Sequence, residues 1–115
     1  MKIRSLVVAG SAILLAMLAL SAWAWFQLPD GAQVPVHWGP NGEPDGWGPK
    51  WLGLLGLPAT AAFVLGLLAL IPRFEPRLAN LSRSAPAYVA IGLAVMGMLA
   101  IMHVAAVMAA LGSDI

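Results

Sequence analysis

The side chains best suited to chemistry lie together in one short polar segment. His37 is followed by Asn41, Glu43 and Asp45, and imidazole and carboxylate groups are common ligands of divalent cations. The spacing matches no established metal motif, and Asn and Asp side chains in such segments also bond the turns of their own loop. A weak metal site formed by His37, Glu43 and Asp45 and a purely structural role therefore both stay open.

The sequence contains no complete catalytic signature. It lacks a His-Glu-x-x-His helix motif, a Gly-x-Ser-x-Gly turn and a Gly-rich phosphate loop. It also contains no Cys, which excludes disulfides and thiolate metal ligands. We therefore expect a protein that is not an enzyme and that uses no cofactor.

The second histidine, His103, is the only strongly polar titratable side chain inside a long apolar segment. Ionisable groups within a membrane are costly and are by default functional candidates. At about 1.5 Å per residue from Ala87, His103 lies in the outer part of the bilayer. It is either a neutral His bonded to a backbone carbonyl or a loop group, or a group coupled to a proton or ligand. We expect one polar cluster of His103 with the loop around His37 and with Glu43 or Asp45.

These candidates are set in a strongly apolar chain. Hydrophobic residues make up 61% and charged residues 10% of the sequence, against about half and about a quarter in soluble domains. Residues 6–26, 51–71 and 87–111 lack charged side chains and are near or above the roughly 20 residues that cross a bilayer. The sequence therefore predicts an all-α membrane protein. It has one domain, residues 1–115, with three transmembrane helices, a structured extracytoplasmic loop at 27–50 and a cytoplasmic loop at 72–86.

The basic residues predict the orientation. Lys50 alone lies in the first loop, and the other basic residues precede the first span or lie in the second loop: Lys2, Arg4, Arg73, Arg77 and Arg83. By the positive-inside rule the N-terminus and second loop are cytoplasmic and the C-terminus is extracytoplasmic. The formal net charge of +1 gives no general attraction for nucleic acid.

The N-terminal segment also imitates a cleavable secretory signal, since basic residues and an apolar run precede Ala22-Trp23-Ala24. The run is longer than a usual signal core, and Trp23 and Trp25 suit the interfacial belt of a membrane span. We therefore expect a retained anchor.

Prolines and small residues predict details of the helices. Pro58 should kink the second helix and Pro72 should end it. Ser82 or Ser84 should cap the third helix, with Pro86 in its first turn. Small residues recur at the spacing that close packing in lipid requires, at Ala59, Ala62, Gly66 and Ala69 and at Ala90, Ala94 and Gly97. We expect packing within the molecule, with a homo-oligomer interface as the alternative.

The loop at 27–50 is rich in Gly and Pro, which excludes a helix. Residues 34–38 alternate Val34, Val36 and Trp38 with Pro35 and His37, which predicts a short extended piece with one apolar face. Residues 40–42 and 44–46 are typical of consecutive tight turns.

These residues also resemble a known family. Leu28-Pro29, Val34-Pro35-Val36-His37-Trp38 and Gly42-Glu43-Pro44-Asp45-Gly46-Trp47-Gly48, followed by Lys50, are similar to the signature loop of a bacterial domain of unknown function numbered sixteen forty-eight. That domain is found at the N-terminus of SdpI-like bacteriocin immunity proteins. Gly39 stands where many members have Asn, which is displaced here to Asn41. The resemblance implies the bacterial cytoplasmic (inner) membrane and a role in resisting a secreted peptide toxin.

We therefore expect an SdpI-like membrane immunity or sensing protein whose outer loop recognises an extracytoplasmic peptide. The expected ligand-binding residues combine aromatic anchors with a few charges: Val36, His37, Trp38, Asn41, Glu43, Asp45, Trp47 and His103. The alternative is a small accessory or self-associating subunit of a membrane complex. The expected partners are the lipid bilayer together with a peptide toxin, a membrane protein or further copies of the chain.

Overall fold

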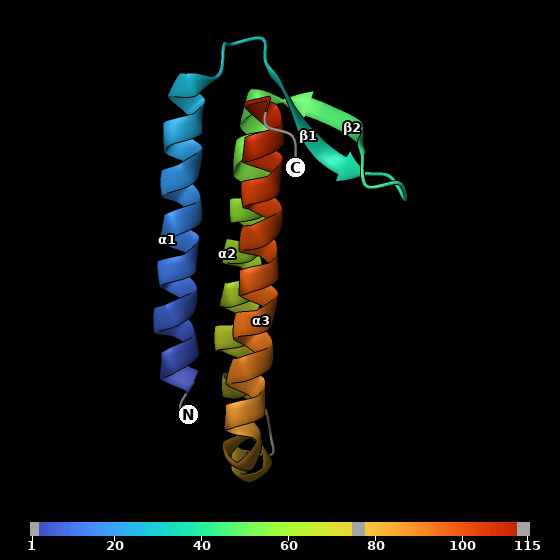
Figure 1. The fold of residues 1–115 in the computed structure, drawn as a ribbon. Coiled ribbons are helices and arrows are strands. Elements are labelled where there is room, and N and C mark those ends of the chain that lie inside the picture. Colours follow the sequence, from blue (N-terminus) through green and yellow to red (C-terminus); the bar gives the residue numbers. More distant parts are fainter. Residues whose placement is uncertain (1–2, 75–77, 113–115) are drawn as a thin grey trace.

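The computed structural model has three long helices side by side and a β-hairpin at one end of the bundle (Figure 1). The helices are α1 (Ile3–Gln27), α2 (Lys50–Phe74) and α3 (Leu78–Ala110), and the strands are β1 (Gln33–Trp38) and β2 (Pro44–Pro49). The structure describes residues 3–74 and 78–112, without the side chains of residues 73–84. Four of the basic groups used to predict the orientation fall outside this description: Lys2, Arg73, Arg77 and Arg83.

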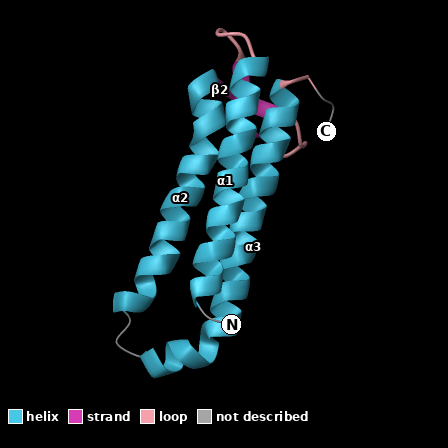
Figure 2. Cartoon of the chain, turned by 90° about the vertical axis from the view of Figure 1, so that its left-hand side faces the viewer, coloured by secondary structure: helices cyan, strands magenta, loops and turns pink. Residues whose placement is uncertain are grey.

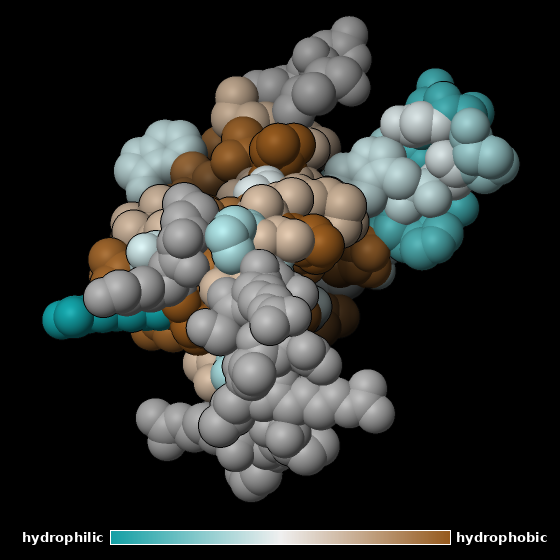
Figure 3. All heavy atoms as spheres, turned by 90° about the horizontal axis from the view of Figure 1, so that it is seen from below, coloured by the Kyte–Doolittle hydropathy of each residue, from teal (hydrophilic) through white to brown (hydrophobic). Residues whose placement is uncertain are grey.

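The three predicted spans are confirmed as helices long and apolar enough to cross a membrane: Ile3–Gln27, Lys50–Pro72 and Ala85–Ala110. Large apolar side chains cover the outside of the bundle, with Leu15, Phe63 and Ile101 exposed to 66%, 68% and 72%. Seen along the bundle, much of the visible surface is hydrophobic, while hydrophilic residues gather on the hairpin that projects to one side (Figure 3). Such a surface fits lipid rather than water. The chain is a multi-pass membrane protein, mostly helical but with a small β-hairpin that the all-α prediction omitted.

The predicted ends of the second and third helices are wrong. The helix α2 continues past Pro72 to Phe74. The helix α3 begins at Leu78, so Pro86 lies inside it and the predicted caps Ser82 and Ser84 are helical residues. Its first part runs across the end of the bundle before the helix turns along it (Figure 2). A proline removes one backbone hydrogen bond and bends a helix, but it does not have to end it.

The small-residue stripes do not pack within the molecule as predicted. Most of their residues are exposed: Ala59, Ala62, Gly66, Ala90 and Ala94. A Cβ atom added at Gly66 would meet nothing within 4 Å. The close helix contacts lie at other glycines, because an added Cβ at Gly10 would stand 2.6 Å from Leu65 and one at Gly92 would stand 2.9 Å from Leu6. Spacing alone did not reveal which face of each helix is turned inward.

The hairpin replaces the predicted series of turns. Strands β1 and β2 pair antiparallel, from Gln33 opposite Pro49 to Trp38 opposite Pro44. Residues 44–46 therefore belong to a strand and not to a turn. The predicted turn at residues 40–42 is confirmed and joins the two strands, with the Gly39 N–H bonded to the Glu43 carbonyl at 2.8 Å and Gly42 at φ 81°. The register shifts on both sides of His37, after Val34 and Pro35 have paired regularly with Gly48 and Trp47. The extended piece is confirmed, but its single apolar face is not, because the neighbours Val34 and Pro35 are both buried while Val36 is exposed.

Candidate functional site

The hairpin is anchored to the bundle by Val34, which is fully buried in a cluster with Ala24 of α1, Leu54 of α2 and Val107 of α3. The close approach of β1 to α2 depends on Gly53, because a Cβ atom there would collide with the Val34 side chain. A buried β-branched side chain in contact with all three helices fixes the base of the hairpin. The candidate site is therefore built on a rigid support.

Lys50 is a second anchor, and the sequence reasoning used it only for topology. Its side chain is nearly buried, and its ammonium donates a hydrogen bond to the Leu28 carbonyl at 3.0 Å. The same nitrogen lies 4.1 Å from the centroid of the Trp25 ring and 3.8 Å from the Asp30 carboxylate. A cation is unfavourable at the start of its own helix α2, but favourable beside the carbonyl-rich end of α1. The sequence did contain a signal for this role, because the single basic residue of the loop lies between two helix ends that carry Trp residues.

His37 and Asp45 form the polar pair of the hairpin. The ring Nδ1 atom lies 2.5 Å from the Asp45 Oδ1 atom, and the two side chains are 72% and 51% exposed. Asp45 lies on β2, and His37 lies beside the register shift of β1. The pairing of the two strands therefore brings into contact two residues that were grouped only because they are close in the sequence. An exposed pair of this kind stabilises the fold little. It is available to a ligand.

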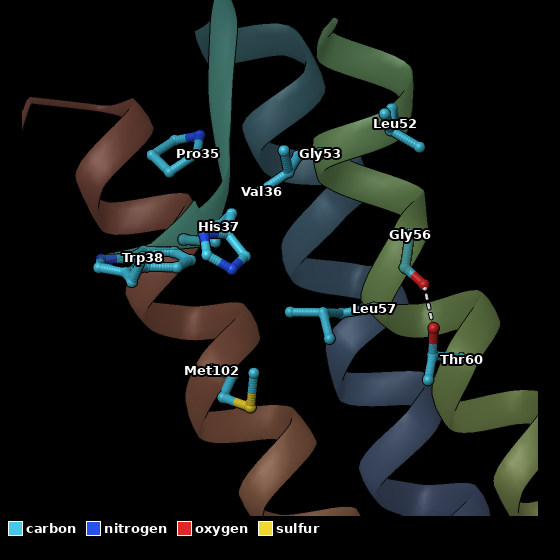
Figure 4. Close-up of a pocket in the computed structure, with 11 residues that line it drawn as sticks. Pro35, Val36, His37, Trp38, Leu52, Gly53, Gly56, Leu57, Thr60 and Met102 are labelled. Carbon is cyan, nitrogen blue, oxygen red and sulfur yellow. Dashed lines mark hydrogen bonds between the residues drawn. The ribbon is translucent and has the colours of Figure 1, made fainter. Parts of the chain in front are cut away.

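A pocket of about 510 Å³ lies between this hairpin and the sides of α2 and α3. Figure 4 shows Val36, His37 and Trp38 facing Leu57 of α2 and Met102 of α3 across this space. Gly56 also lines the pocket, and a Cβ atom added there would meet nothing within 4 Å. The missing side chain thus leaves the pocket open. Its lining is almost entirely apolar, with the His37 ring at its edge.

The other predicted loop residues have different roles. The Asn41 side chain accepts a hydrogen bond from the Glu43 N–H at 3.2 Å, so it stabilises its own turn. Gly39 allows this arrangement, since a Cβ atom there would stand 3.2 Å from the Asn41 oxygen and 3.1 Å from an Asp45 oxygen. The Glu43 side chain is exposed, and Trp47 is 51% exposed on β2. Asn41 is thus occupied within the loop, whereas Glu43 and Trp47 are free to contact a partner.

His103 lies in the helix bundle and bonds to α1, not to the loop. Its Nε2 atom is 2.7 Å from the Ser21 hydroxyl oxygen, and the Ser21 hydroxyl donates to the Leu54 carbonyl at 2.5 Å. Since the Ser21 proton is used in that bond, the His103 Nε2–H is the donor to Ser21. The hydrogen bonds of the expected cluster are not formed, because His103 bonds Ser21, His37 bonds Asp45, and no hydrogen bond between described residues joins the two histidines.

A proline explains why Ser21 finds an acceptor in a helix. In α2 the Leu54 carbonyl would normally accept the N–H of residue 58, which is Pro58 and has none. Ser21 of α1 supplies the missing donor. The second proline follows the same rule, because Pro72 frees the Leu68 carbonyl and the Tyr88 hydroxyl of α3 donates to it at 2.6 Å. Hydroxyl groups from neighbouring helices are a common way to satisfy such freed carbonyls in membranes.

The residues described do not bring together a metal site. Within the described ranges no three His, Cys, Asp or Glu residues are placed to hold an ion. His37 and Asp45 meet, but the third weak candidate, Glu43, does not join them. The His103 Nδ1 atom is buried and has no partner among the described groups.

Residues 12–62 match the model of a family described as Domain of unknown function (DUF1648). Comparisons with curated proteins and with solved structures give no significant match. The matched segment runs from α1 through the hairpin into α2, so it includes Ser21, Lys50 and the α2 wall of the pocket. The family predicted from the signature loop is therefore confirmed for residues 12–62, which match the DUF1648 model.

Proposed function

We propose that this chain is a non-enzymatic membrane immunity or sensing protein of the SdpI-like kind, whose hairpin recognises an extracytoplasmic peptide. The observation that carries the proposal is the hairpin itself, which is anchored by buried Val34 and Lys50 and yet presents exposed His37, Asp45 and Trp47. A segment that merely connects two helices does not need such anchoring. Functional groups on a rigidly supported loop are typical of binding sites.

The proposed orientation places the hairpin outside the bacterial cytoplasmic (inner) membrane and the N-terminus inside. Arg4 lies at the end of α1 opposite the hairpin. The sequence has further basic residues between the second and third spans, and the positive-inside rule assigns them to the same side as the N-terminus. This distribution follows the positive-inside rule.

Bacterial cells that produce the chain provide the test. Cells with the wild-type chain and cells with an empty vector are exposed to a panel of membrane-active peptides of differing charge, and growth inhibition is measured. We expect protection against at least one peptide. His37→Ala and Trp47→Ala should reduce that protection without changing the amount of protein in the membrane, because both side chains are largely exposed.

The matched control for these variants is Phe63→Ala, which removes an exposed aromatic ring from the side of the bundle, away from the hairpin. It should leave protection unchanged. Equal inhibition of producing and empty-vector cells across the whole panel would refute the proposal. Full protection by both hairpin variants would refute the role of the hairpin.

A second candidate is a self-associating or accessory subunit, which the outward-facing small residues Ala59, Ala62 and Gly66 favour. Small exposed side chains allow another helix to approach closely in lipid. Cross-linking in native membranes and purification in mild detergent would then give a dimer or one stoichiometric partner, and Gly66→Leu would abolish it. A monomer in both experiments would exclude this candidate.

A further inference from the structure

We propose that the pocket beneath the hairpin takes an apolar segment of a cationic peptide, whose basic group pairs with the carboxylates of the hairpin end. This inference rests on the proposed function and adds the chemistry of the ligand and the place where it inserts. It follows from the shape of the pocket, from the glycine in its wall and from the charges around its mouth.

The pocket has the size and lining of a binding site for an apolar group. Its volume of about 510 Å³ lies within the range of about 300–1,000 Å³ that is usual for ligand pockets. It follows α2 from Leu52 to Thr60, a length of about 12 Å at 1.5 Å per residue. The far wall is formed by Met102 and Ala106 of α3. An inserted segment would thus run from the hairpin down between the two helices.

Gly56 keeps this space open. The three glycines nearby differ in what a side chain would meet: at Gly53 it would collide with Val34, at Gly48 it would press on Leu52 at 3.0 Å, and at Gly56 it would meet nothing. The first two are explained by the close packing of the hairpin. Gly56 is not explained by packing, and a larger residue there would occupy the volume of the pocket instead of clashing with the fold.

The charges at the hairpin end select a cation. Glu43 and Asp45 are exposed on the hairpin, whereas Lys50 is nearly buried, bonds the Leu28 carbonyl and lies 3.8 Å from the Asp30 carboxylate. Among the described residues, this end of the bundle therefore offers carboxylates and no exposed Lys or Arg. His37 lines the pocket and binds Asp45, so one carboxylate is held at the pocket mouth. The phosphate of a phospholipid would be repelled there, which favours a basic peptide over a lipid.

Binding of three synthetic probes to the full chain in phosphatidylcholine nanodiscs tests the inference. The first is a fluorescent Leu-rich peptide with Lys at both ends, the second has Glu in place of Lys, and the third has Ser in place of Leu. After subtraction of binding to empty nanodiscs, the Lys–Leu peptide should bind best. Its affinity should fall as salt rises, since the charges involved are exposed.

Gly56→Leu should lower the affinity of the Lys–Leu peptide by about tenfold or more, because it removes the site for one large apolar side chain. Gly66→Leu is the matched control, since it makes the same change in the same helix, where an added Cβ atom also meets nothing. It should bind as the wild type does. Asp45→Asn should lower the affinity for the Lys–Leu peptide and reduce the difference in affinity between this peptide and the Glu probe.

Three results would overturn the inference. Unchanged binding by Gly56→Leu would exclude the pocket, although protection that still depends on His37 would leave the proposed function standing. Equal binding of the Lys and Glu probes would exclude the charge argument. Retention of phospholipid by the wild type but not by Gly56→Leu in native mass spectrometry, with no peptide bound by either, would identify a lipid as the occupant.

Discussion

Replacing Ser21 with Ala is expected to destabilise the bundle by more than the loss of one hydroxyl group suggests. That hydroxyl has two partners, because it donates to the Leu54 carbonyl and accepts from His103. Ser21 and His103 are 4% and 0% exposed, so water cannot replace the missing partner. Ser21→Ala would therefore leave two polar groups unsatisfied inside the bundle.

The expected cost is about 2 kcal/mol. A buried polar group without a partner costs about 1–3 kcal/mol in soluble proteins. Hydrogen bonds between membrane helices contribute less, about 0.6 kcal/mol on average, because separated helices find other partners in the membrane. Two affected groups at about 1 kcal/mol each give the expected value. It should appear as a lower free energy of unfolding in mixed detergent micelles, followed by circular dichroism.

A double-mutant cycle with Pro58→Ala separates this explanation from ordinary loss of packing. Ala at position 58 restores the backbone N–H, which can then bond the Leu54 carbonyl within α2. In that background Ser21→Ala should cost only about 1 kcal/mol, because His103 alone loses a partner. The control is Thr60→Val, whose hydroxyl bonds the Gly56 carbonyl of its own helix at 2.9 Å. It should change stability little in either background.

Equal costs of Ser21→Ala with and without Pro58 would refute the reasoning. The Leu54 carbonyl would then not depend on Ser21, and the hydrogen bond would be unrelated to Pro58. A negligible cost in both backgrounds would show in addition that His103 finds another donor or acceptor when Ser21 is absent.

Three further predictions concern the orientation and the anchors of the hairpin. A cysteine introduced at Gly31, which is exposed before β1, should react with an impermeant thiol reagent in whole cells, whereas one at Asn80 should not; the reverse pattern would refute the orientation. Lys50→Met should lower the free energy of unfolding by about 2 kcal/mol through loss of a charged hydrogen bond and a cation–π contact, while Lys50→Arg should lose less, as measured by denaturant unfolding in micelles. Gly53→Val should release the hairpin and raise its protease sensitivity, and Gly66→Leu should not; protection of the hairpin in both variants would contradict the close packing of Val34 against Gly53.

The sequence predicted the membrane spans because length and apolar content alone determine whether a helix can cross a bilayer. It did not predict which helix faces meet, since an almost wholly apolar helix carries no polar stripe that distinguishes the lipid side from the inner side. The stripe at Ala59, Ala62 and Gly66 was misassigned for this reason. The extended piece at residues 34–38 was visible in the pattern, but the register shift beside His37 depends on pairing with β2.

The sequence pattern around each proline also could not predict which groups bond the carbonyls that the prolines leave free. Pro72 is followed by two more helical residues, and the Tyr88 hydroxyl from another helix compensates the bond that Pro72 removes. His103 was recognised as a functional candidate from its place in an apolar segment. Its partner was missed, because Ser21 becomes important only when Pro58 frees a carbonyl and the fold brings α1 beside α2.

One short stretch of α2, residues 53–58, connects the fold to the proposed site. Gly53 leaves room for the Val34 side chain and so allows the hairpin to pack against α2. The Leu54 carbonyl, which Pro58 leaves without an N–H donor in its own helix, accepts a hydrogen bond from Ser21, and Ser21 is in turn bonded to His103. Gly56, between them, leaves the pocket open. The two hydrogen bonds of Ser21, which join α1 to α2 and to α3, thus lie at the level of the pocket, about one turn of helix below the start of α2. Because the pocket walls belong to α2 and α3, and Ser21 of α1 is hydrogen-bonded to both helices, we expect the shape of the proposed site to depend on polar groups that would not themselves touch a ligand.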